Sequence, residues 1–425
     1  MKKLLLVLLL IRSAGHAQDT LVLDDVLKAA ASNYPVVRQY NLIDRSLDYS
    51  LAALNRAYLP QLTINGQAGY QSDVTALPFN NLPFPSVAIV PLDKDQYRLT
   101  GDVIQVVYDG GSVSLQKDLQ RNQSKVESGK LDVEMQRLRE RVRQLYLGIL
   151  MVDGHIAQAE LAGSDITAGT KRMEAAVRNG TAFRSQLSVM QVEELRNKQR
   201  LTELKQQRKQ LLSSLAVLTG RNIPDHQAVG EPLVESTDVK QPAIRRPELE
   251  LFSSQIALTD AQRKFAGSRS LPRLSLFAQG GYGRPGLNFL NNDFDWFYIA
   301  GARLNWNLGA LYSLRAERSQ LSLSGEMIAA LRDAWTMNAA LTVMQYQSDI
   351  VKYQRLLEED DRIVALRDEI KTATKAQLDQ GVITSSDYLR EVNAAEQARL
   401  NRILHRLQLL QVKLELADYM DSKQR

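Results

Sequence analysis

The side chains best placed for chemistry in this sequence lie in the stretch QGVITSSDYLRE, residues 380–391. Asp387 and Glu391 are four residues apart, so a helix would place both carboxylates on one face, with Arg390 beside them. Converging carboxylates favour cations, and a neighbouring arginine neutralises them. The spacing from Thr384 to Asp387 also matches a capping box, in which Asp387 helps to start a helix. The sequence leaves both roles open.

No catalytic, metal or cofactor site is predicted, so we expect that the protein is not an enzyme. The sequence has no HExxH motif, nucleophile elbow or phosphate loop. Its nine methionines are dispersed, and without cysteine it forms no disulfide. The four histidines are far apart; they are His16, His155, His226 and His405.

Residues 1–17 are predicted to be a secretory signal peptide. Lys2 and Lys3 precede a short apolar run at 4–11, and small residues at 15 and 17 suit cleavage before Gln18. A lipoprotein would need cysteine at position 18, so we expect no lipid anchor. The net charge of +5 falls to about +2 without the signal, which gives no support for nucleic-acid binding.

One unit of about 200 residues occurs twice. LPQLTINGQAGY (59–70) returns as LPRLSLFAQGGY (271–282), 212 positions later. Gly180 and Gly381 stand in matching turns, 201 positions apart. We therefore predict a first repeat at 18–220, a linker at 221–245 that is rich in proline, glycine and polar residues, and a second repeat at 246–420.

Each repeat is predicted to run helix, strand, loop, strand, very long helix, turn and return helix. The predicted strands are about 61–70, 97–108, 273–282 and 297–306; the long helices are 112–179 and about 310–378; the return helices are 185–219 and 385–420. At 1.5 Å per residue, the first long helix would extend roughly 100 Å. It carries apolar residues at alternating spacings of four and three, typical of a coiled-coil seam: Leu131, Met135, Leu138, Val142, Leu145, Ile149, Val152 and Ile156.

The predicted strands alternate between apolar and polar residues, which gives each strand two different faces. We expect one face to contact lipid through Tyr70, Leu99, Leu276 and Ala302, and the other to contact water through Asn65, Asp102 and Arg303. Ten tilted residues are enough to cross an outer membrane. Aromatic residues lie at both ends of the strands, as at membrane interfaces: Tyr70, Tyr97, Tyr282, Trp296 and Tyr298 near the loops, and Tyr108 and Trp306 at the opposite end.

Four strands do not close into a spanning barrel, which needs about eight, and lipid does not tolerate open sheet edges. We therefore expect copies of the chain to assemble into a ring. Pro60 and Pro272 directly precede two strands and are predicted to end the incoming helices, because proline lacks a donor and disfavours helix at the preceding residue. The loop at 71–95 either narrows the mouth of a channel or packs against itself.

The sequence resembles the TolC-like outer-membrane efflux proteins over nearly all of residues 20–420. The resemblance depends on the order and spacing of several segments: 245–282, its weaker twin at 33–70, YDGG (108–111), LAVLTG (215–220) and the glycine turns. It implies a mainly helical homotrimer. Four strands per chain would form a twelve-stranded transmembrane β-barrel, continued by long antiparallel coiled-coil helices as a periplasmic α-barrel.

The resemblance also implies a function and partners. The trimer would be the exit duct of a tripartite efflux or type I secretion system, conducting small molecules or polypeptides. It would lie in the outer membrane of a Gram-negative bacterium, contact outer-membrane lipid and extend into the periplasm. There it would dock to a periplasmic adaptor and, through the adaptor, to an inner-membrane pump or exporter. Neither the substrate nor the particular pump follows from the sequence.

The family closes its channel at the periplasmic tip, where each long helix turns back. By resemblance this tip lies around Gly180 and Gly381, with Asp387 at the family's first acidic position and Glu391 one turn further. The family's next acidic position, three residues on, is Arg390 here. The first repeat has Gln186 where Asp387 would fall, so three carboxylates per trimer would ring the pore.

The alternative that the helices alone allow is a periplasmic coiled-coil scaffold or adaptor without a pore. An adaptor should carry a lipoyl-like β-domain between its helical arms, with one hairpin of helices. Neither feature is predicted from this sequence. The two amphipathic hairpins of strands instead favour the channel.

Overall fold

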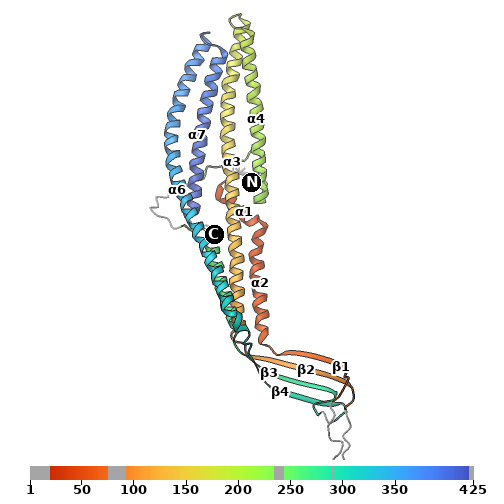
Figure 1. Ribbon diagram of the computed structural model, residues 1–425. Coiled ribbons are helices and arrows are strands. Elements are labelled where there is room, and N and C mark those ends of the chain that lie inside the picture. Colours follow the sequence, from red (N-terminus) through yellow and green to blue (C-terminus); the bar gives the residue numbers. More distant parts are fainter. Residues whose placement is uncertain (1–19, 75–91, 234–243, 289–290, 421–425) are drawn as a thin grey trace, which may run out of the picture. The chain divides into compact units, whose positions relative to one another are not determined.

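The computed structural model describes residues 20–74, 92–233, 244–288 and 291–420. The predicted signal peptide and residues 75–91 of the long loop lie outside these ranges. The α-helices are α1 (Leu23–Asn33), α2 (Arg38–Asn55), α3 (Ser112–Arg178), α4 (Arg184–Thr219), α5 (Pro247–Ser268), α6 (Ala310–Asp379) and α7 (Ser385–Met420) (Figure 1). Short 3-10 helices are η1 (Pro35–Val37) and η2 (Arg56–Tyr58). Within the described ranges, no helix has both the length and the apolar character needed to cross a membrane.

The strands are β1 (Gln61–Tyr70), β2 (Asp95–Tyr108), β3 (Arg273–Arg284) and β4 (Asp295–Asn305), and they form one antiparallel sheet in the order β1-β2-β3-β4. The predicted fold class, mainly helical with four strands, is confirmed. Strand β2 begins two residues before its predicted start, and β3 continues two residues beyond its predicted end. Helix α1 was not predicted as a separate element.

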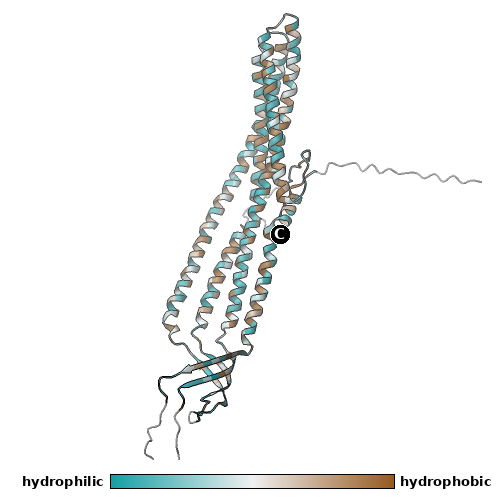
Figure 2. Cartoon of the chain, turned by 90° about the vertical axis from the view of Figure 1, so that its right-hand side faces the viewer, coloured by the Kyte–Doolittle hydropathy of each residue, from teal (hydrophilic) through white to brown (hydrophobic). Residues whose placement is uncertain are grey.

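The chain divides into two compact units, and each combines segments from both predicted repeats. Unit 1 contains residues 1–39, 131–249 and 334–425, and unit 2 contains residues 40–130 and 250–333. Helices α3 and α6 contribute to both units. Apolar and polar residues are interleaved along all the long helices (Figure 2), as expected for helices that bury one stripe.

Unit 1 is built on the predicted seam of α3. Leu138, Val142 and Ile149 are buried in one cluster, while Val152 is buried in the next cluster along the helix. The seam prediction is confirmed here, because Met135, Leu145 and Ile156 pack against the same clusters. Arg208 interrupts the seam of α4, and it forms an ion pair with Asp153 of α3.

Helix α1 closes the largest cluster of unit 1. Its Val26 and Ala30 are 1% exposed and pack with Tyr146 of α3. The Tyr146 hydroxyl donates to the backbone oxygens of Leu21 or Gly230, each 2.6 Å away. Burial raises the pKa of Tyr146 to about 12, so the phenol remains a donor at physiological pH. These contacts fasten the chain before α1 to the segment that follows α4.

Unit 2 joins the sheet to α2, α5 and the adjoining parts of α3 and α6. Pro60 and Pro272 stand directly before β1 and β3, after the helical segments have ended. The YDGG segment forms the turn from β2 into α3. There the Asp109 carboxylate accepts hydrogen bonds from the backbone N–H groups of Gly111 (2.9 Å) and Val113 (2.7 Å), which caps the start of α3.

Candidate functional site

The first candidate site is the four-stranded sheet of unit 2, whose register separates two faces. Residues directly opposite each other in neighbouring strands point to the same side of a sheet. Leu99 lies opposite Tyr282, and Leu276 lies opposite Ala302. Tyr70 lies opposite Asp95 and Leu276 lies opposite Gln105, and both partners are an even number of residues from Leu99 along β2. Since alternate residues of a strand share a face, all four residues predicted to face lipid lie on one side of the sheet.

This apolar face is exposed to solvent in the single chain. Ile64 is 73% exposed, Tyr298 82% and Trp296 76%. The face has twelve large apolar side chains that are more than a third exposed: Leu62, Ile64, Tyr70, Tyr97, Leu99, Val103, Tyr108, Leu276, Tyr282, Trp296, Tyr298 and Leu304. An apolar surface of this size marks a site that contacts lipid or protein.

The opposite face is polar around Asp102. Its carboxylate accepts hydrogen bonds from the side-chain amides of Asn65 (2.7 Å) and Gln279 (2.5 Å), which belong to β1 and β3. Arg303 of β4 lies on the same face, with its guanidinium 4.8 Å from the centre of the Phe277 ring. The three residues predicted to face water therefore share one side of the sheet.

The aromatic residues gather at the ends of the strands. At the loop end, Tyr282 lies opposite Trp296 with ring centres 5.0 Å apart, and Phe294 stacks on Tyr282 and on Tyr97. Phe294 was missed by the sequence analysis because it lies outside the alternating pattern of β4. At the other end, the Trp306 indole N–H donates to the carbonyl of Ser270 at 3.0 Å.

Both edges of the sheet are available for pairing. Among the described residues, β1 pairs only with β2 and β4 pairs only with β3. An unpaired edge presents a row of backbone donors and acceptors to another strand. The sheet formed by a single chain is therefore incomplete, because both of its edge strands lack a partner on one side.

The second candidate site is formed by the tips of the two helical hairpins in unit 1, where α3 turns into α4 and α6 turns into α7. Gly180 and Gly381 both have φ of +76°, a conformation that favours glycine. In each turn the glycine N–H and the following N–H bond back to the end of the long helix, at 2.9–3.1 Å. This is the Schellman arrangement, which satisfies the last carbonyls of a helix.

The predicted capping box is present at the second tip. The Thr384 hydroxyl accepts from the N–H of Asp387 at 3.2 Å, and the Asp387 carboxylate accepts from the N–H of Thr384 at 3.2 Å. Arg390 pairs with Asp387 at 2.6 Å, while Glu391 pairs instead with Arg367 of α6 at 3.0 Å. The Thr384 hydrogen bonds, followed by Arg390, hold the pKa of Asp387 below its usual range.

The two hairpins pack against each other near their tips. Tyr388 of α7 is 1% exposed and lies in a cluster with Ile166 of α3 and Met190 of α4. Two cross-hairpin ion pairs flank this cluster: Lys371 with Asp165 at 2.8 Å, and Arg172 with Asp379 at 2.9 Å.

A further ion pair joins the two return helices. Arg200 of α4 donates to Glu396 of α7 at 2.6 Å, and the Glu396 side chain is only 9% exposed. Burial raises the pKa of Glu396, with Arg200 opposing this rise and Glu193 adding to it. No local sequence pattern predicts this pair, because its members are 196 positions apart in different repeats.

In the part of the chain that the structure describes, no three acidic or histidine side chains come together to hold a metal ion. On α7, the Nδ1 atom of His405 lies within hydrogen-bond distance of the Asp360 carboxylate of α6, at 2.6 Å. The polar chemistry of both sites consists of ion pairs and hydrogen bonds.

Solved structures of outer-membrane channels share this fold. The outer membrane protein VceC from Vibrio cholerae matches with a TM-score of 0.72 at 12% identity, covering 94% of this chain and 95% of that chain. The CmeC outer membrane channel of Campylobacter jejuni gives 0.69 at 12%, covering 94% and 87%. The open state of the MtrE outer membrane channel of Neisseria gonorrhoeae gives 0.69 at 14%, covering 94% and 88%.

No protein-family model matches the chain, and no curated protein matches it by sequence. At 12–14% identity the likeness establishes the fold, which is that of outer-membrane channels along nearly the whole chain. This agrees with the fold implied by the resemblance to TolC-like proteins.

Proposed function

We propose that the chain is one protomer of a homotrimeric channel in the bacterial outer membrane. The observation that carries the proposal is the incomplete sheet, which has an exposed apolar face, a polar face centred on Asp102 and two unpaired edges. A scaffold without a pore would have no use for an apolar sheet face of this size. The fold shared with solved outer-membrane channels supports the same conclusion.

The apolar face provides the driving force for insertion into lipid. Its twelve large side chains are each more than a third exposed. Burial of one such side chain contributes about 1.5–3 kcal/mol when it is complete, so partial burial of all twelve is worth on the order of 15 kcal/mol per chain. Lipid is the partner that accepts this face, while the opposite face, with Asn65, Asp102 and Arg303, lines a water-filled lumen.

Closure of the sheet requires other copies of the chain. Pairing of β1 of one copy with β4 of the next removes both edges, and three copies supply twelve strands. Mass measurement of the purified protein in detergent tests this. We expect three chains per particle, and a stable monomer would overturn the proposal.

The helical hairpins extend the conduit into the periplasm, where their tips dock to a periplasmic adaptor and through it to an inner-membrane pump or exporter. The channel then acts as the exit duct of a tripartite efflux or type I secretion system. Gly180 and Gly381 shape the tips, and Asp387, Arg390 and Glu391 lie at the candidate gate. Recordings in planar bilayers should show ion-conducting channels, and an absence of conductance from a trimeric preparation would count against a pore.

A further inference from the structure

Two arginines lie on the polar face of the sheet at its helix end, where α5 leads into β3 and β4 leads into α6. Arg303 of β4 lies opposite Ser275 of β3, and Arg273 lies two residues before Ser275 in the same strand. Alternate residues of a strand share a face, and so do residues opposite each other in paired strands, which places both arginines on the polar face. Both residues are exposed. This end of the face therefore carries two cations per chain.

The Arg303 guanidinium is positioned by an aromatic ring beneath it. Phe277 lies directly opposite Gly301, and a Cβ atom on this glycine would be 3.2 Å from the Cε1 atom of the ring. The ring therefore lies across Gly301, close to the strands. The guanidinium carbon of Arg303 lies over the ring, 4.8 Å from its centre. Stacking of this kind leaves the N–H groups at the edge of the guanidinium plane available to an oxyanion.

No carboxylate pairs with these two arginines among the residues that the structure describes. Neither Arg273 nor Arg303 belongs to an ion pair or donates a side-chain hydrogen bond there. Asp102 is the closest acidic residue of the strands on this face, four residues along β2 from Val106, which is in register with Ser275 and Arg303. Four residues of strand extend about 13 Å. Because the Debye length is about 10 Å in 0.1 M salt, Asp102 offsets little of the positive charge.

A neighbouring copy of the chain would supply no carboxylate to Arg303 either. In the proposed trimer, β4 of one copy pairs with β1 of the next, and the sequence of β1 contains no acidic residue. Asp109, which follows β2, is 8% exposed and uses its carboxylate to cap α3. Two arginines from each of three copies would therefore place six uncompensated guanidinium groups at one level of the barrel.

The loop end of the same face has a different balance of charge. Arg98 of β2 is in register with Gly283 of β3 and Asp295 of β4, so an acidic residue shares its row across the sheet. This row lies eight residues along β2 from the row of Arg303, which is about 26 Å. The excess of positive charge on the polar face is therefore concentrated at the helix end.

A closed barrel of this size is narrow enough for these charges to act on a passing solute. Twelve strands that are about 4.8 Å apart and tilted by about 40° give a backbone circumference of about 75 Å and a radius of about 12 Å. Side chains that project inward reduce the open radius below this value. Because the Debye length in 0.1 M salt is about 10 Å, the fields of the six guanidinium groups overlap across the lumen.

We propose that Arg273 and Arg303 form a basic ring in the barrel lumen that binds solutes bearing phosphate, sulfonate or carboxylate groups as they leave through the channel. The proposal rests on the trimeric channel of the proposed function and adds a chemical class of solute to it. Rings of arginine or lysine suit pores that conduct anions and phosphates. The guanidinium fork also matches two oxygens of such a group.

Block of single channels by inorganic tripolyphosphate tests the basic ring. In planar bilayers with about 0.1 M KCl, tripolyphosphate on both sides should block the wild type, and Arg273→Gln/Arg303→Gln should raise the half-blocking concentration about tenfold. Arg273→Lys/Arg303→Lys keeps the charge and should stay within about threefold of the wild type. A wild type that is not blocked, or a glutamine variant blocked as strongly as the wild type, overturns the proposal.

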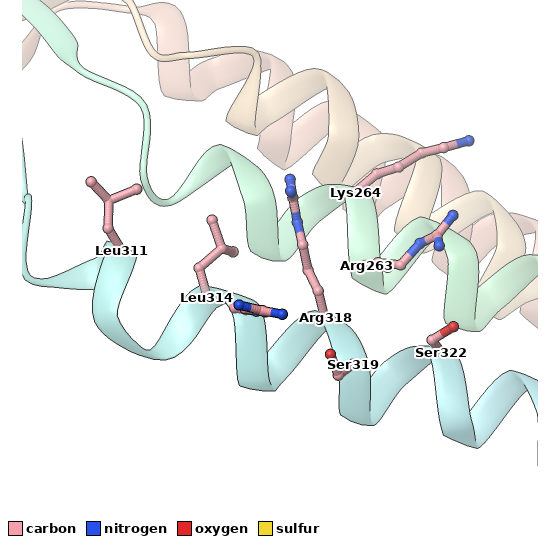
Figure 3. A pocket seen from close by; sticks show the side chains of 8 residues that line it. Arg263, Lys264, Leu311, Leu314, Arg318, Ser319 and Ser322 are labelled. Carbon is pink, nitrogen blue, oxygen red and sulfur yellow. The ribbon is translucent and has the colours of Figure 1, made fainter.

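Two cations outside the sheet provide the matched control. Arg315 and Arg318 of α6 line a groove between α5 and α6, and Figure 3 shows Arg318 extending toward α5. A Cβ atom at Gly267 of α5 would clash with this guanidinium, so Arg318 packs between helices of its own chain. Arg315→Gln/Arg318→Gln removes as many charges as the ring variant but should leave the half-blocking concentration within about twofold of the wild type. Equal effects of the two double variants would assign the block to overall charge and overturn the basic ring.

Calorimetric titration of the detergent-solubilised trimer with tripolyphosphate gives a readout that needs no conductance. Binding should weaken about tenfold in Arg273→Gln/Arg303→Gln, and it should be lost in about 1 M KCl, where the Debye length falls to about 3 Å. If the variant melts at a lower temperature but binds tripolyphosphate as the wild type does, the arginines only stabilise the sheet and the proposal is wrong. A conducting trimer that binds no tripolyphosphate overturns the basic ring alone, whereas a wild type that is monomeric or conducts no ions refutes the proposed function.

Discussion

Removing Arg200 should lower the free energy of unfolding much more than removing the charge of its ion-pair partner Glu396. The two side chains differ in burial, since Glu396 is 9% exposed and Arg200 is 39% exposed. Arg200→Ala leaves a buried carboxylate without this cation and with Glu193 nearby, which should cost about 3 kcal/mol at neutral pH. Glu396→Gln leaves an arginine that still reaches water, so it should cost about 1 kcal/mol or less.

The pH dependence follows from the raised pKa of Glu396. Because the folded state holds this proton more tightly than the unfolded state, its contribution to the free energy of unfolding grows as pH falls through the folded pKa, and it is lost as pH rises. Arg200→Ala removes the charge that opposes this shift. The variant should therefore regain part of its lost stability between pH 7 and pH 5, whereas Glu396→Gln has no carboxyl group to protonate.

Thermal unfolding of the trimer in detergent, followed by helical circular dichroism, measures both effects. At about 2 °C per kcal/mol, Arg200→Ala should melt about 6 °C below the wild type at pH 7. The matched control is Arg196→Ala, which removes a 72% exposed arginine paired with Glu193 at 3.7 Å and should shift melting by about 1 °C or less. Equal losses from Arg200→Ala and Glu396→Gln, or a deficit of Arg200→Ala that is unchanged at pH 5, would refute the reasoning.

Three further predictions test the candidate sites. Asp387→Asn should keep the cap with Thr384 but lower the cation preference and divalent block of single channels in planar bilayers; unchanged recordings would limit Asp387 to capping. Gly381→Ala and Gly180→Ala should each lower the free energy of unfolding by about 1–2 kcal/mol, because both glycines have φ of +76°. A Cβ would meet no neighbouring atom at either site, so the two losses should be equal, and a large difference between them would contradict the equivalence of the turns. Asp102→Cys should react with a water-soluble maleimide and Leu99→Cys should not. The reverse pattern would show that the proposed lipid and water faces of the sheet are exchanged.

The correctly predicted parts of the fold are those that short-range patterns in the sequence indicate. The seam of α3 follows from spacings of three and four, and the faces of β1 follow from a period of two. Glycine marks both tip turns, because only glycine adopts φ of +76° without strain. Each of these signals lies within a few residues of chain, so one sequence is enough to detect it.

The features that sequence reasoning missed depend on contacts between distant segments. Arg200 and Glu396 each lie in an ordinary helical pattern, and only the packing of α4 on α7 brings them together. Helix α1 was missed although six of its eleven residues are apolar, and it closes the main cluster around Tyr146.

The difference between the two tips bears directly on the role of Asp387. Helix α4 begins after Phe183, which makes no side-chain cap, and Gln186 occupies the position that Asp387 has in α7. The uncapped turn at Gly180 nevertheless has the same φ and the same hydrogen-bond pattern as the capped turn at Gly381. A capping box is therefore unnecessary for forming such a tip, and capping alone does not account for a carboxylate in only one of them. One further difference between the tips is the Asp387 charge, which is the property that Asp387→Asn changes while the cap is retained.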